Sequence, residues 1–287
     1  EMTLEIPAGG PYRIDTSLET KSTVPDLTWL YRGDCVLHLG VGNLFIIAGQ
    51  SNSAGYSRDF CIDPPSMDVH LYRNRSKWDI ASHPMNESTF AGSLANEEMG
   101  VPGVSPYLAF GKTYGKMTGM PVGLIQTSLG GSPMERWNPK DGDLYLNMVD
   151  KIHQTGGRYA GVLWYQGCSD TNPGPAEKYL EHFREYVEAT RKELGYEIPF
   201  FTMQLNRQIN GINDECWGMV RDAQARAAKE IPGVSVLTTS NLSLCDGIHN
   251  TAQANVALGE KLAKQCAHVL NGKEEYQPPE LVKVERA

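Results

Sequence analysis

Ser51 stands where a serine side chain can do chemistry. It belongs to the run Gly-Gln-Ser-Asn at residues 49–52, which directly follows the apolar run 43–48. Such a run is typical of a buried strand, and Gly49 permits a sharp turn at its end because glycine adopts backbone conformations closed to other residues. Open α/β sheets place their chemistry at the carboxyl ends of strands. Ser51 is therefore a candidate nucleophile, although an ordinary polar turn also fits these four residues.

Asp246 and His249 supply the other groups that an activated serine needs. They follow a second apolar run, 234–238. An acid three residues before a histidine in one tight loop can accept a hydrogen bond from Nδ1 of the ring. That bond fixes the tautomer and stabilises the imidazolium formed when Nε2 takes a serine proton. We therefore predict a catalytic triad of Ser51, His249 and Asp246.

Two further loops follow predicted strands and carry groups that can stabilise negative charge. Residues 128–137 contain the adjacent pair Gly130 and Gly131, and residues 164–170 contain Gln166. A glycine pair lets a backbone N–H point at a developing oxyanion, and a glutamine amide can donate to it without carrying charge. A flexible turn and a glutamine that satisfies loop backbone groups are the alternatives.

The four segments 49–52, 128–137, 164–170 and 246–249, in this order, resemble the SGNH-hydrolase superfamily. Within it, the chain is similar to the sialate O-acetylesterase / acetylxylan esterase group (carbohydrate esterase family 6-like), from about Val41 to Leu270. The resemblance implies a serine esterase that removes O-acetyl groups from carbohydrate, of the acetylated xylan or mannan type or sialic acid, without a metal or other cofactor. It also implies an oxyanion hole formed by the N–H of Ser51, by Gly130 or Gly131, and by Gln166.

Cys168 departs from the pattern of that group, because glutamate is usual at this position and serves in some relatives as the proposed acid partner of the histidine. A thiol cannot act as a permanently charged partner. We therefore assign this role to Asp246, with Asp170 as the alternative.

Five residues are candidates for binding substrate. Gln50 and Asn52 flank the nucleophile, and Trp164 opens the third loop. Trp78 lies in the long irregular stretch 56–103, where its indole can stack on a sugar or cover the core. Arg136 can contact substrate or form a surface salt bridge.

Alternating strands and helices predict a mostly parallel sheet with helices on both faces. The resemblance implies a three-layer, flavodoxin-like SGNH-hydrolase fold, an α/β fold with a five-stranded, mainly parallel sheet. The expected strands are 43–48, 122–125, 162–164, 198–203 and 234–238, with 69–72 as a possible short addition. Residues 1–40 predict a β-rich lead-in packed on an esterase domain at 41–273, and 274–287 form a tail.

Composition narrows the class of partner. A net charge of −8 over 287 residues argues against nucleic acid, and no apolar run is long enough to cross a membrane. The six scattered cysteines form no Cys-x-x-Cys pair, so we expect no structural zinc site. Oligomeric state and compartment, cytoplasmic or secreted, stay open; no signal peptide is visible.

Three other interpretations compete with an esterase of this kind. α/β-Hydrolases share the order Ser, Asp, His but use Gly-x-Ser-x-Gly, and Ser53 replaces the second glycine here. A carbohydrate-binding protein without turnover is a second alternative, favoured by Cys168. Transfer of the acyl group to another sugar is a third.

Overall fold

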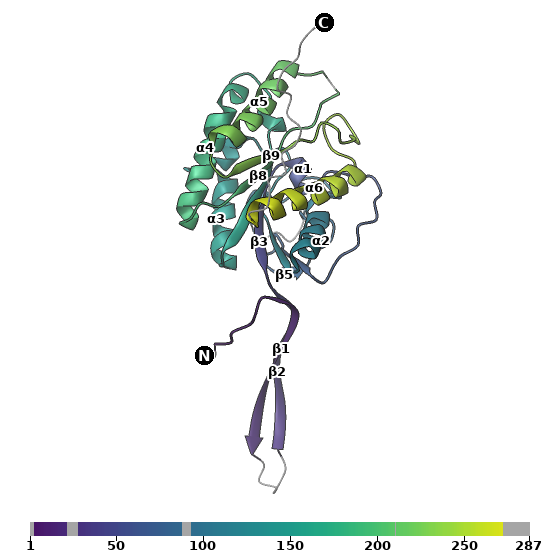
Figure 1. The fold of residues 1–287 in the computed structure, drawn as a ribbon, viewed down its shortest axis with the longest axis vertical. Helices are drawn as coiled ribbons and strands as arrows, with labels where there is room; N and C mark the ends of the chain where they lie inside the picture. The colour runs from purple at the N-terminus through teal and green to yellow at the C-terminus, as the bar shows by residue number, and fades with distance from the viewer. Residues whose placement is uncertain (1–2, 22–27, 88–92, 210, 272–287) are drawn as a thin grey trace.

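A seven-stranded sheet crosses the main body of the protein in the order β5-β4-β6-β3-β7-β8-β9 (Figure 1). The computed structural model describes residues 3–21, 28–87, 93–209 and 211–271. Neighbouring strands run parallel except for β5, which is antiparallel to β4. The strands are β3 (Asn43–Gly49), β4 (Val69–Tyr72), β5 (Trp78–Ile80), β6 (Val122–Gln126), β7 (Tyr159–Tyr165), β8 (Phe200–Met203) and β9 (Val234–Leu237).

The five expected strands are all present, and the sheet has two more strands than the expected five. The additions are β4, which was expected as a possible short strand, and β5, which was not expected. These strands have four and three residues. They are too short to produce a clear periodic pattern, and both lie in a stretch rich in turn-forming residues.

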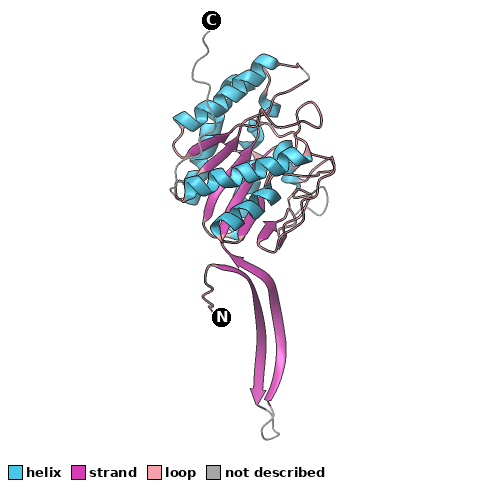
Figure 2. Cartoon of the chain, turned by 45° about the vertical axis from the view of Figure 1, so that its right-hand side comes forward, coloured by secondary structure: helices cyan, strands magenta, loops and turns pink. Residues whose placement is uncertain are grey.

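Helices cover both faces of the sheet, as Figure 2 shows, so the predicted three-layer α/β fold is confirmed. Side chains of β3 alternate between the faces: Ile46 packs into one buried cluster and Ile47 into the other. The first cluster includes side chains of α3, α4 and α5, and the second includes those of α2 and α6. The helices are α1 (Ser51–Ala54), α2 (Tyr107–Thr118), α3 (Asp143–Thr155), α4 (Pro175–Leu194), α5 (Asp214–Glu230) and α6 (Ala252–Leu270).

Capping residues fix the start of α6, which follows the loop that carries Asp246 and His249. The Thr251 hydroxyl accepts a hydrogen bond from the N–H of Ala254, the usual N-cap arrangement. The carboxylate of Asp59, from the segment after α1, accepts from the N–H of Ala252. The helix start is therefore fastened to the segment that follows Ser51.

The first strands, β1 (Gly9–Lys21) and β2 (Thr28–Val41), form a separate antiparallel ribbon that projects from the main body (Figure 1). We expected a β-rich lead-in packed on the esterase domain, but Leu18 and Tyr31 in the ribbon are exposed. The base of the ribbon, around 36–42, lines a cavity together with residues of the main body such as His70 and Pro121. The expected tail 274–287 lies outside the described residues.

Candidate active site

Ser51 is the first residue of α1, at the carboxyl end of the central strand β3. The turn depends on Gly49, whose φ of 132° is rarely adopted by residues with a side chain. A Cβ on Gly49 would also overlap the backbone carbonyl of Tyr165 in the neighbouring strand β7. Close packing of β3 on β7 and the sharp exit toward Ser51 therefore both require glycine here.

The structure brings Ser51, His249 and Asp246 together in a hydrogen-bonded chain. His249 Nε2 lies 2.8 Å from Ser51 Oγ, and Nδ1 lies 2.6 Å from Asp246 Oδ2. The other carboxylate oxygen of Asp246 accepts the backbone N–H groups of Ile248 (2.9 Å) and His249 (2.7 Å). This arrangement can move a proton from the serine to the imidazole while the carboxylate holds the ring.

Hydrogen bonds keep Asp246 in its charged form. Partial burial raises the pKa of the Asp246 carboxyl, but the N–H groups of Ile248 and His249 and the imidazole itself lower it further, so the net shift is downward. A carboxylate that stays charged near neutral pH is what the histidine requires of its partner.

Asn52 was predicted to bind substrate, but its side chain binds the histidine loop. Its amide donates to the carbonyl of Ile248 (3.1 Å), and its carbonyl oxygen accepts the N–H of Asn250 (3.1 Å). The residues on both sides of His249 are therefore held by the residue next to Ser51. The oxygen and the nitrogen of the Asn52 side chain therefore both have partners within the protein.

Gln50 also differs from its predicted substrate role. Its side-chain oxygen accepts the N–H groups of Gly167 (2.9 Å) and Ser169 (3.2 Å), and the residue is buried. Gln50 therefore ties the turn before Ser51 to the loop that follows β7.

Gln166 does not offer its amide to an oxyanion, which corrects the prediction. Its NH₂ group donates to the carbonyl of Ser132 (3.0 Å) and to Asp170 (2.5 Å). Asp170 in turn accepts the N–H of Met134 at 3.1 Å, and burial raises the pKa of its carboxyl. Both residues hold the second and third loops together, and Asp170 is not the partner of His249.

Cys168 contributes no charge to the site. Burial raises the pKa of its thiol to about 12, so it is neutral at physiological pH. The departure from glutamate at this position is compatible with the observed contact between Asp246 and His249, because the acid already comes from the histidine's own loop.

The two glycines differ in whether their backbone N–H groups already donate a hydrogen bond within the protein. The N–H of Gly130 donates to a carboxylate oxygen of Glu98 at 2.8 Å and is therefore used within the protein. Gly131 is exposed, has φ of 69°, and has open space where a Cβ would lie. Within the described part of the chain, the backbone N–H groups of Gly131 and Ser51 have no hydrogen-bond acceptor.

Two further predicted substrate residues, Trp164 and Arg136, have partners within the protein. Trp164 is fully buried against Trp137 and belongs to the core. Arg136 forms an ion pair with Asp143, with contacts of 2.9 and 2.6 Å, which is the salt bridge given as its alternative.

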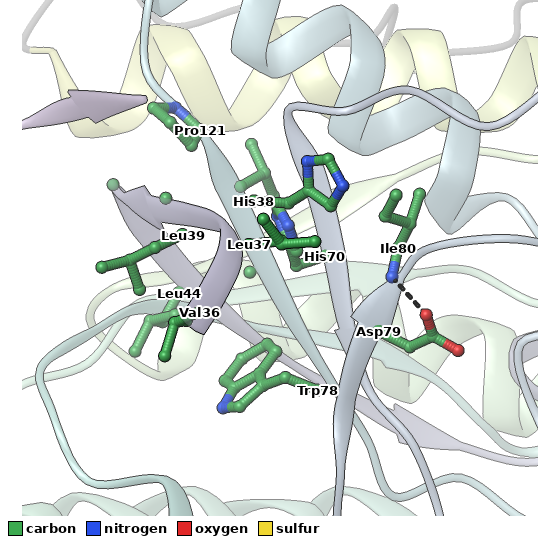
Figure 3. A pocket seen from close by; sticks show the side chains of 14 residues that line it. Val36, Leu37, His38, Leu39, Leu44, His70, Trp78, Asp79, Ile80 and Pro121 are labelled. Atoms are coloured by element: carbon green, nitrogen blue, oxygen red, sulfur yellow. Dashed lines mark hydrogen bonds between the residues drawn. The ribbon is translucent and has the colours of Figure 1, made fainter. Parts of the chain in front are cut away.

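The ring of Trp78 points toward the amino ends of the strands, away from Ser51, although its backbone pairs with Tyr72 at the carboxyl end of β4. Its ring lines a cavity of about 430 Å³ at the base of the β1–β2 ribbon, with Leu44 and Gly123 at the amino ends of β3 and β6 (Figure 3). It is 43% exposed there. The predicted sugar platform beside the nucleophile is therefore wrong.

Tyr56 is a site residue that the sequence did not reveal. Its ring stacks on the His249 imidazole, with centroids 5.4 Å apart and an interplanar angle of 29°. Burial and a 2.7 Å hydrogen bond to Glu98 raise the pKa of the Tyr56 phenol, so it stays protonated. No motif marks Tyr56, since its partners lie far away in the sequence.

No metal site accompanies these groups in the residues described: nowhere do three or more His, Cys, Asp or Glu side chains gather to hold an ion. In the same residues, no helix is long and apolar enough to cross a membrane. The six cysteines are free thiols.

The fold has known counterparts among solved structures. The X-ray structure of a protein from Arabidopsis thaliana aligns with a TM-score of 0.68 and 24% identity, over 78% of this chain and 97% of that one. A carbohydrate acetylesterase from Xanthomonas citri aligns with a TM-score of 0.64 and 22% identity, over 93% of this chain and 62% of that one. NanS aligns with a TM-score of 0.66 and 11% identity, over 80% and 98%. At these identities the likeness shows a shared fold.

Sequence comparison identifies the family. A probable carbohydrate esterase of Arabidopsis thaliana is 26% identical over 245 residues, which are 77% of this chain and 88% of that protein. Residues 41–268 match the family described as carbohydrate esterase, sialic acid-specific acetylesterase. The match spans most of the chain and confirms the resemblance to the sialate O-acetylesterase group. The chain therefore belongs to the carbohydrate esterase family of sialic acid-specific acetylesterases.

Proposed function

We propose that this protein is a serine O-acetylesterase that acts on carbohydrate. The observation that carries the proposal is the continuous chain from Ser51 Oγ through His249 to Asp246, with contacts of 2.8 and 2.6 Å. A nucleophile, a general base and an orienting acid in this order are the apparatus of acyl transfer through a covalent intermediate.

In the proposed reaction, His249 Nε2 takes the proton of Ser51 as Oγ attacks the acetyl carbonyl. The tetrahedral intermediate collapses when His249 returns the proton to the leaving sugar hydroxyl, which leaves an acetyl-serine. Water, activated by the same imidazole, then releases acetate and restores Ser51. Asp246 stabilises the imidazolium in both halves of the reaction.

For the oxyanion we propose the backbone N–H groups of Ser51 and Gly131 as donors. These two N–H groups have no acceptor among the described residues, whereas Gly130 and Gln166 already donate hydrogen bonds within the protein. This difference supports the choice. Loss of one such donor typically costs about 100- to 1000-fold in rate. No cofactor takes part in this chemistry.

The sugar is proposed only by class. The family includes sialic acid-specific acetylesterases, and acetylated xylan or mannan oligosaccharides are the other candidates of the same chemistry. Acyl transfer to a second sugar would use the same intermediate, with a sugar hydroxyl in place of water.

Acetate release tests the proposal. Wild-type protein would be compared with Ser51→Ala and Asp246→Asn on acetylated xylan, acetylated mannan and O-acetyl sialic acid. We expect the wild type to act on at least one of them. The kcat of Ser51→Ala should be at least about 10⁴-fold lower than that of the wild type. The kcat of Asp246→Asn should fall by a factor on the order of 10⁴.

A matched control is Ser53→Ala, because Ser53 is a buried serine of the same short helix that bonds to Ala48 and Tyr107. It should keep most of the activity. Acetate release that survives in Ser51→Ala would overturn the mechanism. A wild type that releases no acetate and does not react with a fluorophosphonate probe would favour the binding protein without turnover.

A further inference from the structure

Glu98 is a buried carboxylate beside the triad that the mechanism above does not use. The residue is only 3% exposed. Its Oε2 accepts the hydroxyl of Tyr56 (2.7 Å), and its Oε1 accepts the N–H of Gly130 (2.8 Å) and the amide of Asn86 (2.5 Å). In the described residues no basic side chain forms an ion pair with it. A buried charge is costly unless hydrogen bonds compensate it, so this arrangement needs a reason.

The partners of Glu98 belong to two different elements of the candidate site. Through Tyr56 it reaches the general base, because the Tyr56 ring stacks on His249 at 5.4 Å. Through Gly130 it holds the loop whose next residue, Gly131, carries the proposed oxyanion donor. One carboxylate is therefore bonded both to the support of the proton acceptor and to the oxyanion loop.

Glu98 is itself fixed by the protein core. Asn86, which donates to it, accepts a hydrogen bond from Asn74 (2.5 Å), and the buried amine of Lys151 on α3 donates to Asn74 (3.1 Å). Such fully buried polar networks restrict side chains to one arrangement. The carboxylate is therefore a rigid reference point for the two elements that it contacts.

The histidine needs such support. Asp246 is half exposed, with 50% of its side chain accessible, and its contact with the His249 imidazole is a hydrogen bond at Nδ1. One hydrogen bond in the ring plane lets the imidazole rotate about that bond. An aromatic ring stacked on the imidazole face limits this rotation.

We infer that Tyr56 and Glu98 are positioning residues of this esterase: Tyr56 holds the His249 ring, and Glu98 holds Tyr56 and the Gly130 loop in register. The inference rests on the proposed function. Positional errors near 1 Å can cost about 100-fold in rate, so the effect should fall on kcat more than on KM.

The test measures kcat, KM and the rate of fluorophosphonate labelling for Tyr56→Leu, Tyr56→Phe and Glu98→Gln, with circular dichroism and melting for each. Tyr56→Leu should lose about 10- to 100-fold in kcat, with KM changed by less than about threefold. Tyr56→Phe keeps the stacked ring and should recover a large part of that loss. Glu98→Gln keeps the shape and should lower kcat and the labelling rate together.

A double variant tests the coupling. If Glu98 acts partly through the Tyr56 hydroxyl, Tyr56→Phe with Glu98→Gln should lose less kcat than the product of the single losses. The matched control is Tyr196→Phe, whose hydroxyl bonds to the backbone of Tyr159 at the amino end of β7, away from Ser51. It should change melting but not kcat.

The possible results distinguish failure of the positioning role from failure of the proposed esterase function. Wild-type kcat and labelling rates in folded Tyr56→Leu and Glu98→Gln would overturn the positioning role and leave the esterase proposal intact. A wild type that neither releases acetate nor reacts with the probe would overturn the esterase proposal, and the positioning role with it.

Discussion

Lys151 shows how one buried residue makes stability depend on pH. It is 1% exposed, and its amine donates to Asn74, Asn96 and the carbonyl of Gln126, all neutral acceptors. Burial lowers the pKa of Lys151 to about 7. The folded state therefore holds fewer protons than the unfolded state between about pH 7 and the ordinary lysine value, so this residue makes stability rise as pH rises through that window.

We predict that Lys151→Met removes this pH dependence. The difference in unfolding free energy between wild type and variant, from urea denaturation at pH 7, 8 and 9, should shift toward the wild type by up to about 1.4 kcal/mol per pH unit. Working with the difference cancels the titration of tyrosines and cysteines common to both proteins. The control is Lys116→Met, the same substitution at an exposed lysine, measured in the same way. A constant difference for Lys151→Met would contradict a lowered pKa.

At the same scale, residue roles could be predicted only where the partners are close in sequence or fixed by a strand end. Asp246 and His249 are three residues apart, and Ser51 directly follows a strong apolar run, so their meeting was foreseeable. Gln50 bonds to Gly167, 117 residues away, and nothing local tells whether its amide meets backbone or substrate.

At the scale of elements, the loop between β9 and α6 is the part of the site that most needs external support. It has no strand or helix of its own over 238–251 beyond an isolated bridge between Leu244 and Asn250. Asn52 on α1 holds it through Ile248 and Asn250. Helix α1 therefore presents Ser51 and also locates His249.

We predict that Asn52→Ala lowers kcat by about 10- to 100-fold, since the loop can shift by about 1 Å. It should also reduce the free energy of unfolding by about 1–3 kcal/mol, because the N–H of Asn250 is left buried without its acceptor. Asn52→Asp retains that acceptor but loses the donor to Ile248. It should lose less stability than Asn52→Ala in the same denaturation and acetate assays, and equal losses would argue against the acceptor's role.

Helices and strands could be predicted where the segment is long and its apolar residues recur with a clear period. The apolar spacing of Tyr179, Phe183 and Tyr186 predicts a helix from about Pro175 to Leu194, and α4 occupies this range with these three side chains buried. For α2, the pair Ser105 and Pro106 predicts a helix with the serine as its cap and the proline as its first residue. The helix instead begins one position later, at Tyr107, with Pro106 as its N-cap. Such boundaries depend on local cap geometry, which the sequence pattern defines less well than the core face.

At the scale of the whole molecule, the ribbon of β1 and β2 stands apart from the fold that holds the site. Neither buried cluster includes a residue before Leu44, and every residue placed in the site lies after Gly49. An isolated two-stranded ribbon is at best marginally stable in water. The family match begins at residue 41, where the ribbon ends.

We predict that a variant starting at Gly40 folds and keeps the kcat of the full chain within about twofold. Its melting temperature should fall only slightly, because the truncation uncovers Leu44 and Trp78 at the base of the ribbon but removes none of the buried clusters. A variant starting at Ile47 is the control: it lacks most of β3, the strand paired with both β6 and β7, and should not fold. Circular dichroism, thermal melting and acetate release would be measured for both. Loss of folding in the first variant would mean that the ribbon belongs to the folding unit of the esterase, in spite of its exposed position.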